Sequence, residues 1–182
     1  MKREMQGLML GVIGLLGAGW LMNRILLPRK QQRQCEINLK QIGLAMMQYS
    51  RDYDEKLPPR SKWQTVFIPY HSGHQDPPQP PLECPSGWYY AMNGHLAGKS
   101  LGVINSPQSL AFAWDAQTTQ RNTMDNGRLW PVPLRHPDGN NVLFMDGHVA
   151  AVKRRPRSVV VVNTTTPSIP TVVLLRTVKR VR

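Results

Sequence analysis

Three side chains in the C-terminal part of the chain have the types and spacing for chemistry: His136, Asp146 and His148. Two imidazoles and a carboxylate could bind a metal ion or act as general acid and base. The structural alternative is that Asp146 and Gly147 form a tight turn, with Gly147 at positive φ, while His136 hydrogen-bonds across a sheet. We favour the structural interpretation and expect no enzyme, because a hydrolase also needs a nucleophile or an oxyanion arrangement, and none is recognisable.

The chain has two cysteines, Cys35 and Cys84. Two cysteines do not define a disulfide framework, and nothing in the sequence shows that they meet in space. They could pair in an oxidising compartment, or remain as two thiols, one on a helix face and one in a turn.

The residues around His148 predict short β-strands. Apolar runs at 142–145 and 149–152 flank Asp146-Gly147-His148, and Asp-Gly between apolar runs is a strong hairpin signal. Further strands are predicted at 88–92 and 109–114. The C-terminal part of the head is therefore expected to be an antiparallel meander.

Residues 29–57 have the pattern of an amphipathic helix that would cover one face of such a sheet. Its apolar side chains recur at intervals of three and four residues, and the stripe consists of Cys35, Leu39, Ile42, Met46, Tyr49 and Tyr53. Leu57-Pro58-Pro59 is expected to end the helix.

The N-terminal residues 1–28 predict a retained transmembrane anchor. Gly7 to Met22 carries no charge, and the apolar character resumes at Ile25, so the stretch approaches the length needed to span a bilayer. A cleaved signal peptide fits poorly, because Leu26-Leu27-Pro28-Arg29-Lys30 offers no small-residue cleavage site. If Pro28 only kinks the chain, anchor and amphipathic helix form one long helix.

The basic charge is concentrated in the C-terminal tail, residues 154–182. The formal net charge is +12, and from Lys153 onward there are eight lysines and arginines and no acidic residue. Such a tail could contact nucleic acid, anionic lipid or an acidic polymer, or it could be a solvated extension.

Several segments together resemble the bacterial pseudopilin-like proteins, which are related to the G-like subunits of type II secretion. The stretch from Cys35 to Ala45, followed by Asp52 to Pro59, resembles their stalk. Their C-terminal H-X9-DG motif is matched by His136 and Asp146-Gly147, and the resemblance covers about residues 35–153.

This resemblance implies an α+β, pilin-like fold, in which a long N-terminal transmembrane and amphipathic helix packs on a small antiparallel head. The expected parts are an anchor (1–28), a stalk helix (29–57), a head (58–153) and the basic tail (154–182). Secretion pseudopilins also bind calcium in a head loop, for which Asp115 and Asp125 are the candidate ligands here.

The resemblance further implies a structural subunit of a type II secretion or type IV pilus-like system. Its N-terminus is expected in the cytoplasm, its single span in the inner membrane, and its head outside, with other pilin-like subunits as partners. Gly7 is the candidate processing site, although Val12 stands where prepilins carry a glutamate. The alternatives are an uncleaved binding module, whose head and tail contact DNA, lipid or cell-wall polymer, and a membrane-tethered hydrolase.

Overall fold

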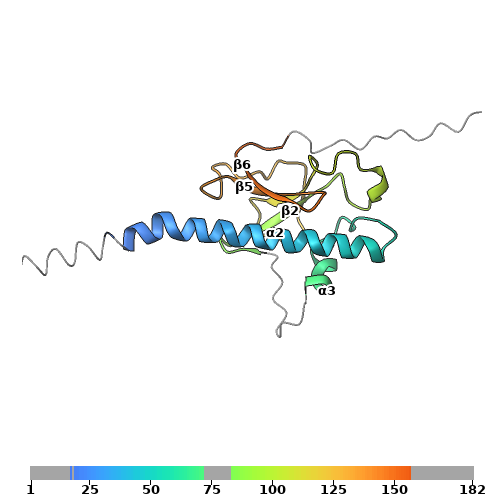
Figure 1. Cartoon of the computed structure of the whole chain (residues 1–182), viewed down its shortest axis with the longest axis horizontal. Helices are drawn as coiled ribbons and strands as arrows, with labels where there is room; N and C mark the ends of the chain where they lie inside the picture. The colour runs from blue at the N-terminus through green and yellow to red at the C-terminus, as the bar shows by residue number, and fades with distance from the viewer. Residues whose placement is uncertain (1–16, 18, 72–82, 157–182) are drawn as a thin grey trace, which may run out of the picture.

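The computed structural model describes residues 17, 19–71 and 83–156. A long helix lies along one face of a small, mainly antiparallel sheet (Figure 1). This arrangement confirms the α+β class and the packing of an N-terminal helix on a sheet. The segments that follow determine where the candidate site lies.

The helical path continues through Pro28. A π-helical turn, η1 (Met22–Leu26), leads directly into α2 (Leu27–Asp52), and the N–H of Leu27 donates to the carbonyl of Met22. This wider turn shifts the hydrogen-bond register just before Pro28, which has no N–H to donate. Proline therefore does not end the helix.

The predicted anchor, residues 1–28, falls mostly outside the described residues. Among the helices that are described, none combines the length and the apolar character needed to cross a membrane.

The helix ends earlier than Leu57-Pro58-Pro59, where the sequence predicted its end. It stops at Asp52, and Asp54 and Glu55 both adopt left-handed backbone conformations, with φ of 51° and 56°. This turn reverses the chain, so that Leu57 enters the core and its N–H donates to the carbonyl of Lys99 at 2.8 Å. The apolar residue before the prolines thus belongs to the head and not to the helix.

The sheet has the strand order β1-β2-β3-β5-β6, with antiparallel pairing between all neighbours. The strands are β1 (Glu83–Cys84), β2 (Trp88–Asn93), β3 (Ala111–Asp115), β5 (Asn140–Phe144) and β6 (Val149–Val152). A short β4 (Met124–Asp125) pairs with β2 in parallel. Helical turns η2 (Thr65–Phe67), α3 (Ile68–His71) and η3 (Leu101–Val103) complete the head.

The β5–β6 hairpin turns at Asp146-Gly147-His148, as the sequence predicted. Gly147 has a φ of 90°, and the N–H of Phe144 donates to the carbonyl of His148 at 2.9 Å. Positive φ is readily accessible to glycine, so the Asp-Gly pair specifies the turn.

The core lies between α2 and the sheet. The helix buries Cys35, Leu39, Ile42, Met46 and Tyr49 against aromatic and aliphatic side chains of the head. Each fully buried leucine or isoleucine contributes about 2 kcal/mol of hydrophobic stabilisation. Tyr53 differs from the predicted stripe, because it follows the last helical residue, remains 52% exposed and stacks on Tyr49 with ring centroids 4.3 Å apart.

Candidate functional site

The residues of the sequence motif are divided between two places. Asp146 and His148 pair with each other at the exposed tip of the hairpin, with His148 Nδ1 2.6 Å from Asp146 Oδ1. His136 is buried near the opposite end of β5, which is roughly 13 Å long. Within the described ranges these three side chains do not form a common ligand set. In the part of the chain that the structure describes, the side chain of His136 contacts Asp115 and Cys84 and not the hairpin tip.

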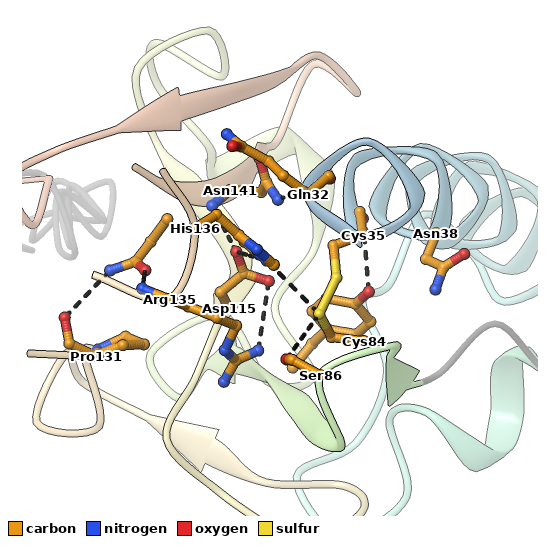
Figure 2. Close-up of polar contacts among 12 residues, drawn as sticks. Gln32, Cys35, Asn38, Cys84, Ser86, Asp115, Pro131, Arg135, His136 and Asn141 are labelled. Atoms are coloured by element: carbon orange, nitrogen blue, oxygen red, sulfur yellow. Dashed lines mark hydrogen bonds and ion pairs between the residues drawn. A yellow bond between two sulfur atoms is a disulfide. The ribbon is translucent and has the colours of Figure 1, made fainter. Parts of the chain in front are cut away.

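His136 instead belongs to a buried polar cluster where α2 meets the sheet (Figure 2). Four of its side chains offer atoms of the ligand type, and all four atoms lie within 4.8 Å of one another. The full cluster consists of Gln32, Cys35, Cys84, Asp115, Arg135, His136 and Asn141.

A disulfide between Cys35 and Cys84 connects α2 to β1, two elements that are 49 residues apart in the sequence. Both cysteines are buried, and the hydroxyl of Ser86 donates to the sulfur of Cys84 at 3.1 Å. A cross-link over a loop of this length stabilises a fold by about 4 kcal/mol through loss of unfolded-state entropy. The bond therefore fixes the head on the helix covalently.

Asp115, the last residue of β3, is the acidic centre of the cluster. Its Oδ2 accepts the N–H of Asn141 at 2.7 Å, and its Oδ1 lies 3.5 Å from Arg135 Nη1. Burial raises the pKa of this carboxyl to about 6, although Arg135 and Asn141 favour the ionised form. Near neutral pH it is therefore a carboxylate paired with a guanidinium.

Arg135 is held on several sides. Its Nη2 donates to the carbonyl of Ala116, and its guanidinium lies over the ring of Trp88, 5.9 Å from the centroid. Burial lowers the pKa of Arg135, while the neighbouring Asp115 carboxylate acts in the opposite direction. Because arginine retains its charge in proteins, the Asp115–Arg135 pair stays ionic, and its two charges compensate each other.

His136 lies between the acid and the disulfide. Its Nε2 is 3.4 Å from Asp115 Oδ2 and 3.5 Å from Cys84 Sγ. Burial, with the nearby Arg135 charge, lowers the pKa of the imidazole to about 4. At neutral pH the ring is therefore uncharged, and in one tautomer it can donate its Nε2–H to the Asp115 carboxylate.

Amide side chains connect the cluster to the helix. Asn141 Nδ2 donates to the carbonyl of Gln32 at 3.4 Å, and Gln32 Oε1 accepts the N–H of Asp138 at 3.2 Å. The N–H of Arg135 donates to Asn140 Oδ1 at 2.8 Å. These bonds join the first turns of α2, β5 and the loop that carries His136.

The candidate calcium ligands are used differently. Asp115 belongs to the buried cluster. The carboxylate of Asp125 instead stabilises its own loop, because it accepts hydrogen bonds from the N–H groups of Gly127, Arg128 and Leu129, each at 2.9 Å. Over the described ranges, Asp125 belongs to no common ligand set with Asp115.

An open cavity of about 250 Å³ lies beside the cluster. Its wall includes Trp88, Pro131, Val132, Pro133 and Arg135, but not Asp115, His136 or the disulfide. The carboxylate of Asp115, the imidazole of His136 and the disulfide therefore do not line this cavity.

Sequence reasoning missed Arg135, Asn141 and Gln32 as members of the site. Arg135 adjoins His136 in the chain, and Asn141 follows Asn140 at the start of a strand whose other residues are apolar, where a polar residue signals a buried bonding role. Gln32 left no comparable signal, because it lies in a polar stretch at the start of the helix.

A family model described as "Protein of unknown function (DUF1559)" matches residues 31–96. This family is linked to pilin-like, prepilin-type proteins. The matched segment is less than half of the chain; it includes Cys35 and Cys84 but ends before Asp115 and His136. No curated protein and no solved structure matched the chain.

Proposed function

We propose that this chain is a non-catalytic, membrane-anchored, pseudopilin-like subunit of a type II secretion or type IV pilus-like assembly. The proposal rests on the fixed contact between α2 and the head. A disulfide and the hydrogen bonds of Gln32 with Asp138 and Asn141 hold the head on the helix, while the N-terminal part of the helix extends beyond the sheet (Figure 1).

The exposed apolar side chains of the helix support a role in assembly. Trp20, Leu21, Met22, Leu26 and Leu27 are 42–63% exposed in the part that extends past the head. Leu44, at 62% exposure, and Ile37 lie on the outer side of α2, seven residues apart and so on one face. Contiguous exposed apolar surface is typical of sites that contact lipid or another protein.

The buried polar cluster supports a structural rather than a catalytic role. Asp115 and His136 are enclosed, and each has partners within the cluster. A catalytic group must reach a substrate, usually through a concave pocket. The cavity beside the cluster is not lined by either residue.

The disulfide supports a head outside the cytoplasm. Disulfides form and persist in oxidising compartments and are rare in the cytosol. A cytoplasmic N-terminus, one span of the inner membrane and an extracytoplasmic head are consistent with the Cys35–Cys84 bond.

The first test is the intact mass of the protein extracted from the membranes of its native cell. Loss of residues 1–7 would show prepilin-type processing after Gly7, despite Val12, and would support an assembled subunit. A full-length mass would overturn the processed subunit and favour the uncleaved binding module. For that module we expect binding to DNA or anionic lipid. Added salt should abolish this binding, and so should removal of residues 153–182.

The assembly role is tested separately on the outer face of α2. Leu44→Glu should abolish crosslinked oligomers in membranes without changing the melting temperature of the head, because Leu44 is exposed. Gln48→Glu is the matched control, since it places the same charge one turn further along the exposed face. Crosslinking of Leu44→Glu at the wild-type level would contradict the proposed contact.

A further inference from the structure

We propose that Cys35, Cys84, His136 and Asp115 form a zinc site when the disulfide is reduced. The inference does not depend on the proposed assembly role. It rests on the convergence of two sulfurs, one imidazole nitrogen and one carboxylate oxygen, all buried and all within 4.8 Å of one another. Two thiolates, a histidine and a carboxylate form a ligand set of the kind that zinc accepts.

The distances from the His136 nitrogen to two of the other ligand atoms already fit tetrahedral coordination of an ion. Zinc bonds of about 2.3 Å to sulfur and about 2.0–2.2 Å to nitrogen and oxygen place neighbouring ligand atoms about 3.4–3.6 Å apart at tetrahedral angles. His136 Nε2 lies 3.5 Å from Cys84 Sγ and 3.4 Å from Asp115 Oδ2. The nitrogen is thus at ligand–ligand distance from both a sulfur and an oxygen.

The charges of the cluster also balance with the ion bound. Zinc with two thiolates and the Asp115 carboxylate carries a net charge of −1. The guanidinium of Arg135, whose Nη1 lies 3.5 Å from Asp115 Oδ1, neutralises this charge. In the disulfide form, Asp115 and Arg135 balance each other. Because an uncompensated charge is costly in a buried site, the same arginine serves both states.

Neighbouring groups already orient the ligands. The N–H of Asn141 donates to Asp115 Oδ2, and the hydroxyl of Ser86 donates to Cys84 Sγ. Hydrogen bonds of this kind commonly hold metal ligands in position. A neutral imidazole with its proton on Nδ1 offers the lone pair of Nε2 to the ion.

The conversion needs a reductant and a separation of the sulfurs. A dithiol reductant passes two electrons and two protons to Cys35 and Cys84 and closes into its own disulfide. Zinc then replaces the two thiol protons, which leave to solvent. The sulfurs must separate to about 3.8 Å to bind one ion, a movement that side-chain rotation at the helix and at β1 can provide.

The test uses the full-length chain in detergent, reduced without oxygen by a water-soluble phosphine and then gel-filtered. The phosphine takes up the oxygen of one water molecule as the disulfide becomes two thiols. Cobalt(II) is added first as a spectroscopic probe, and zinc second. We expect thiolate-to-cobalt charge-transfer bands with intense tetrahedral visible bands, their loss on adding zinc, and one zinc retained per chain. The oxidised chain should retain none.

Two further measurements identify the ligands. His136→Ala should weaken zinc binding at least tenfold, whereas His148→Ala, which removes the exposed Asp146–His148 pair, should leave it unchanged. X-ray absorption of the zinc-loaded wild type should show two sulfur and two nitrogen or oxygen ligands, a result that does not require a variant to fold. Equal zinc retention by reduced and oxidised chains, or a first shell without two sulfurs, would overturn the site.

Discussion

His136 Nε2 lies 3.4 Å from Asp115 Oδ2, and neither side chain is accessible to solvent beyond 1%. Burial shifts the two groups in opposite directions: the pKa of Asp115 rises to about 6, and that of His136 falls to about 4. In each case burial favours the neutral form, which is protonated for the acid and deprotonated for the imidazole.

These shifts have opposite effects on stability across the same pH window. Between about pH 4 and 6 the folded state holds a proton on Asp115 that the unfolded state has lost, so this group's contribution to the free energy of unfolding falls as pH rises. Over about pH 4 to 6.5 the unfolded state holds a proton on His136 that the folded state lacks, so that contribution rises. In the wild type the two slopes largely cancel.

Single substitutions should therefore reveal each slope. Relative to wild type, His136→Asn should lose stability from pH 4 to 6.5, by on the order of 3 kcal/mol, and Asp115→Asn should gain a comparable amount over pH 4 to 6. Urea unfolding of the oxidised protein at several pH values measures the difference curves, in which the other carboxylates cancel. Difference curves that stay flat for both variants would contradict the opposing shifts.

Arg135 should be far more important for stability than an exposed arginine in a similar setting. Arg135→Ala leaves the buried Asp115 carboxylate without its counter-ion, and we expect a loss of about 3–5 kcal/mol at pH 7. Arg121→Ala is the matched control: Arg121 also pairs with a carboxylate, that of Glu83, and also lies over an aromatic ring, that of Tyr89, but at the surface. Its loss should cost less than about 1 kcal/mol.

Urea unfolding of the two arginine variants at pH 7 measures the difference. Similar losses in both would mean that burial adds nothing to the Asp115–Arg135 pair. A stable Arg135→Ala protein with a further raised Asp115 pKa would show that the acid takes up a proton in place of the missing charge.

The sequence predicted the main elements because each has a local signal. The three-four spacing from Cys35 to Tyr49 marks the buried face of α2, and Asp146-Gly147 marks the hairpin. The end of the helix was wrong, since two non-glycine residues, Asp54 and Glu55, adopt positive φ there. Aspartate tolerates positive φ better than most residues, but glutamate does not, so no local pattern predicts two such residues in succession. Leu57, just after this turn, is buried in the head.

The buried cluster could not be predicted in the same way, because it is assembled from distant parts of the chain. Cys35 lies on α2, Cys84 on β1, Asp115 at the end of β3 and His136 in the loop before β5. Which of these residues become neighbours depends on the strand order of the sheet, in which β3 lies beside β5. The spacing of His136 to Asp146 in the sequence suggested a shared site, yet an extended strand separates residues that are close in the chain.

The disulfide should account for a large share of the stability of the head. Replacing both cysteines by alanine, Cys35→Ala with Cys84→Ala, should lower the free energy of unfolding by about 4 kcal/mol, because the unfolded chain regains the freedom of a loop of 49 residues. Urea unfolding with a chelator present measures this, so that metal binding does not intervene. The unreduced wild type is the reference, and a loss below about 1 kcal/mol would show that the polar contacts alone secure the helix.

Gly139 should be irreplaceable in the loop that places His136 beside the disulfide. Its N–H donates to the carbonyl of His136 at 3.2 Å, its φ is 138°, and a Cβ would lie 2.7 Å from the backbone oxygen of Val152. Gly139→Ala therefore adds a clash with a backbone atom of β6 to the strain of positive φ, and should cost more than about 2 kcal/mol. Gly87→Ala is the matched control, since Gly87 also has positive φ, 82°, but faces open space, and it should cost about 1 kcal/mol. Thermal or urea unfolding of both variants separates the two effects, and equal losses would show that β6 yields to the added methyl group.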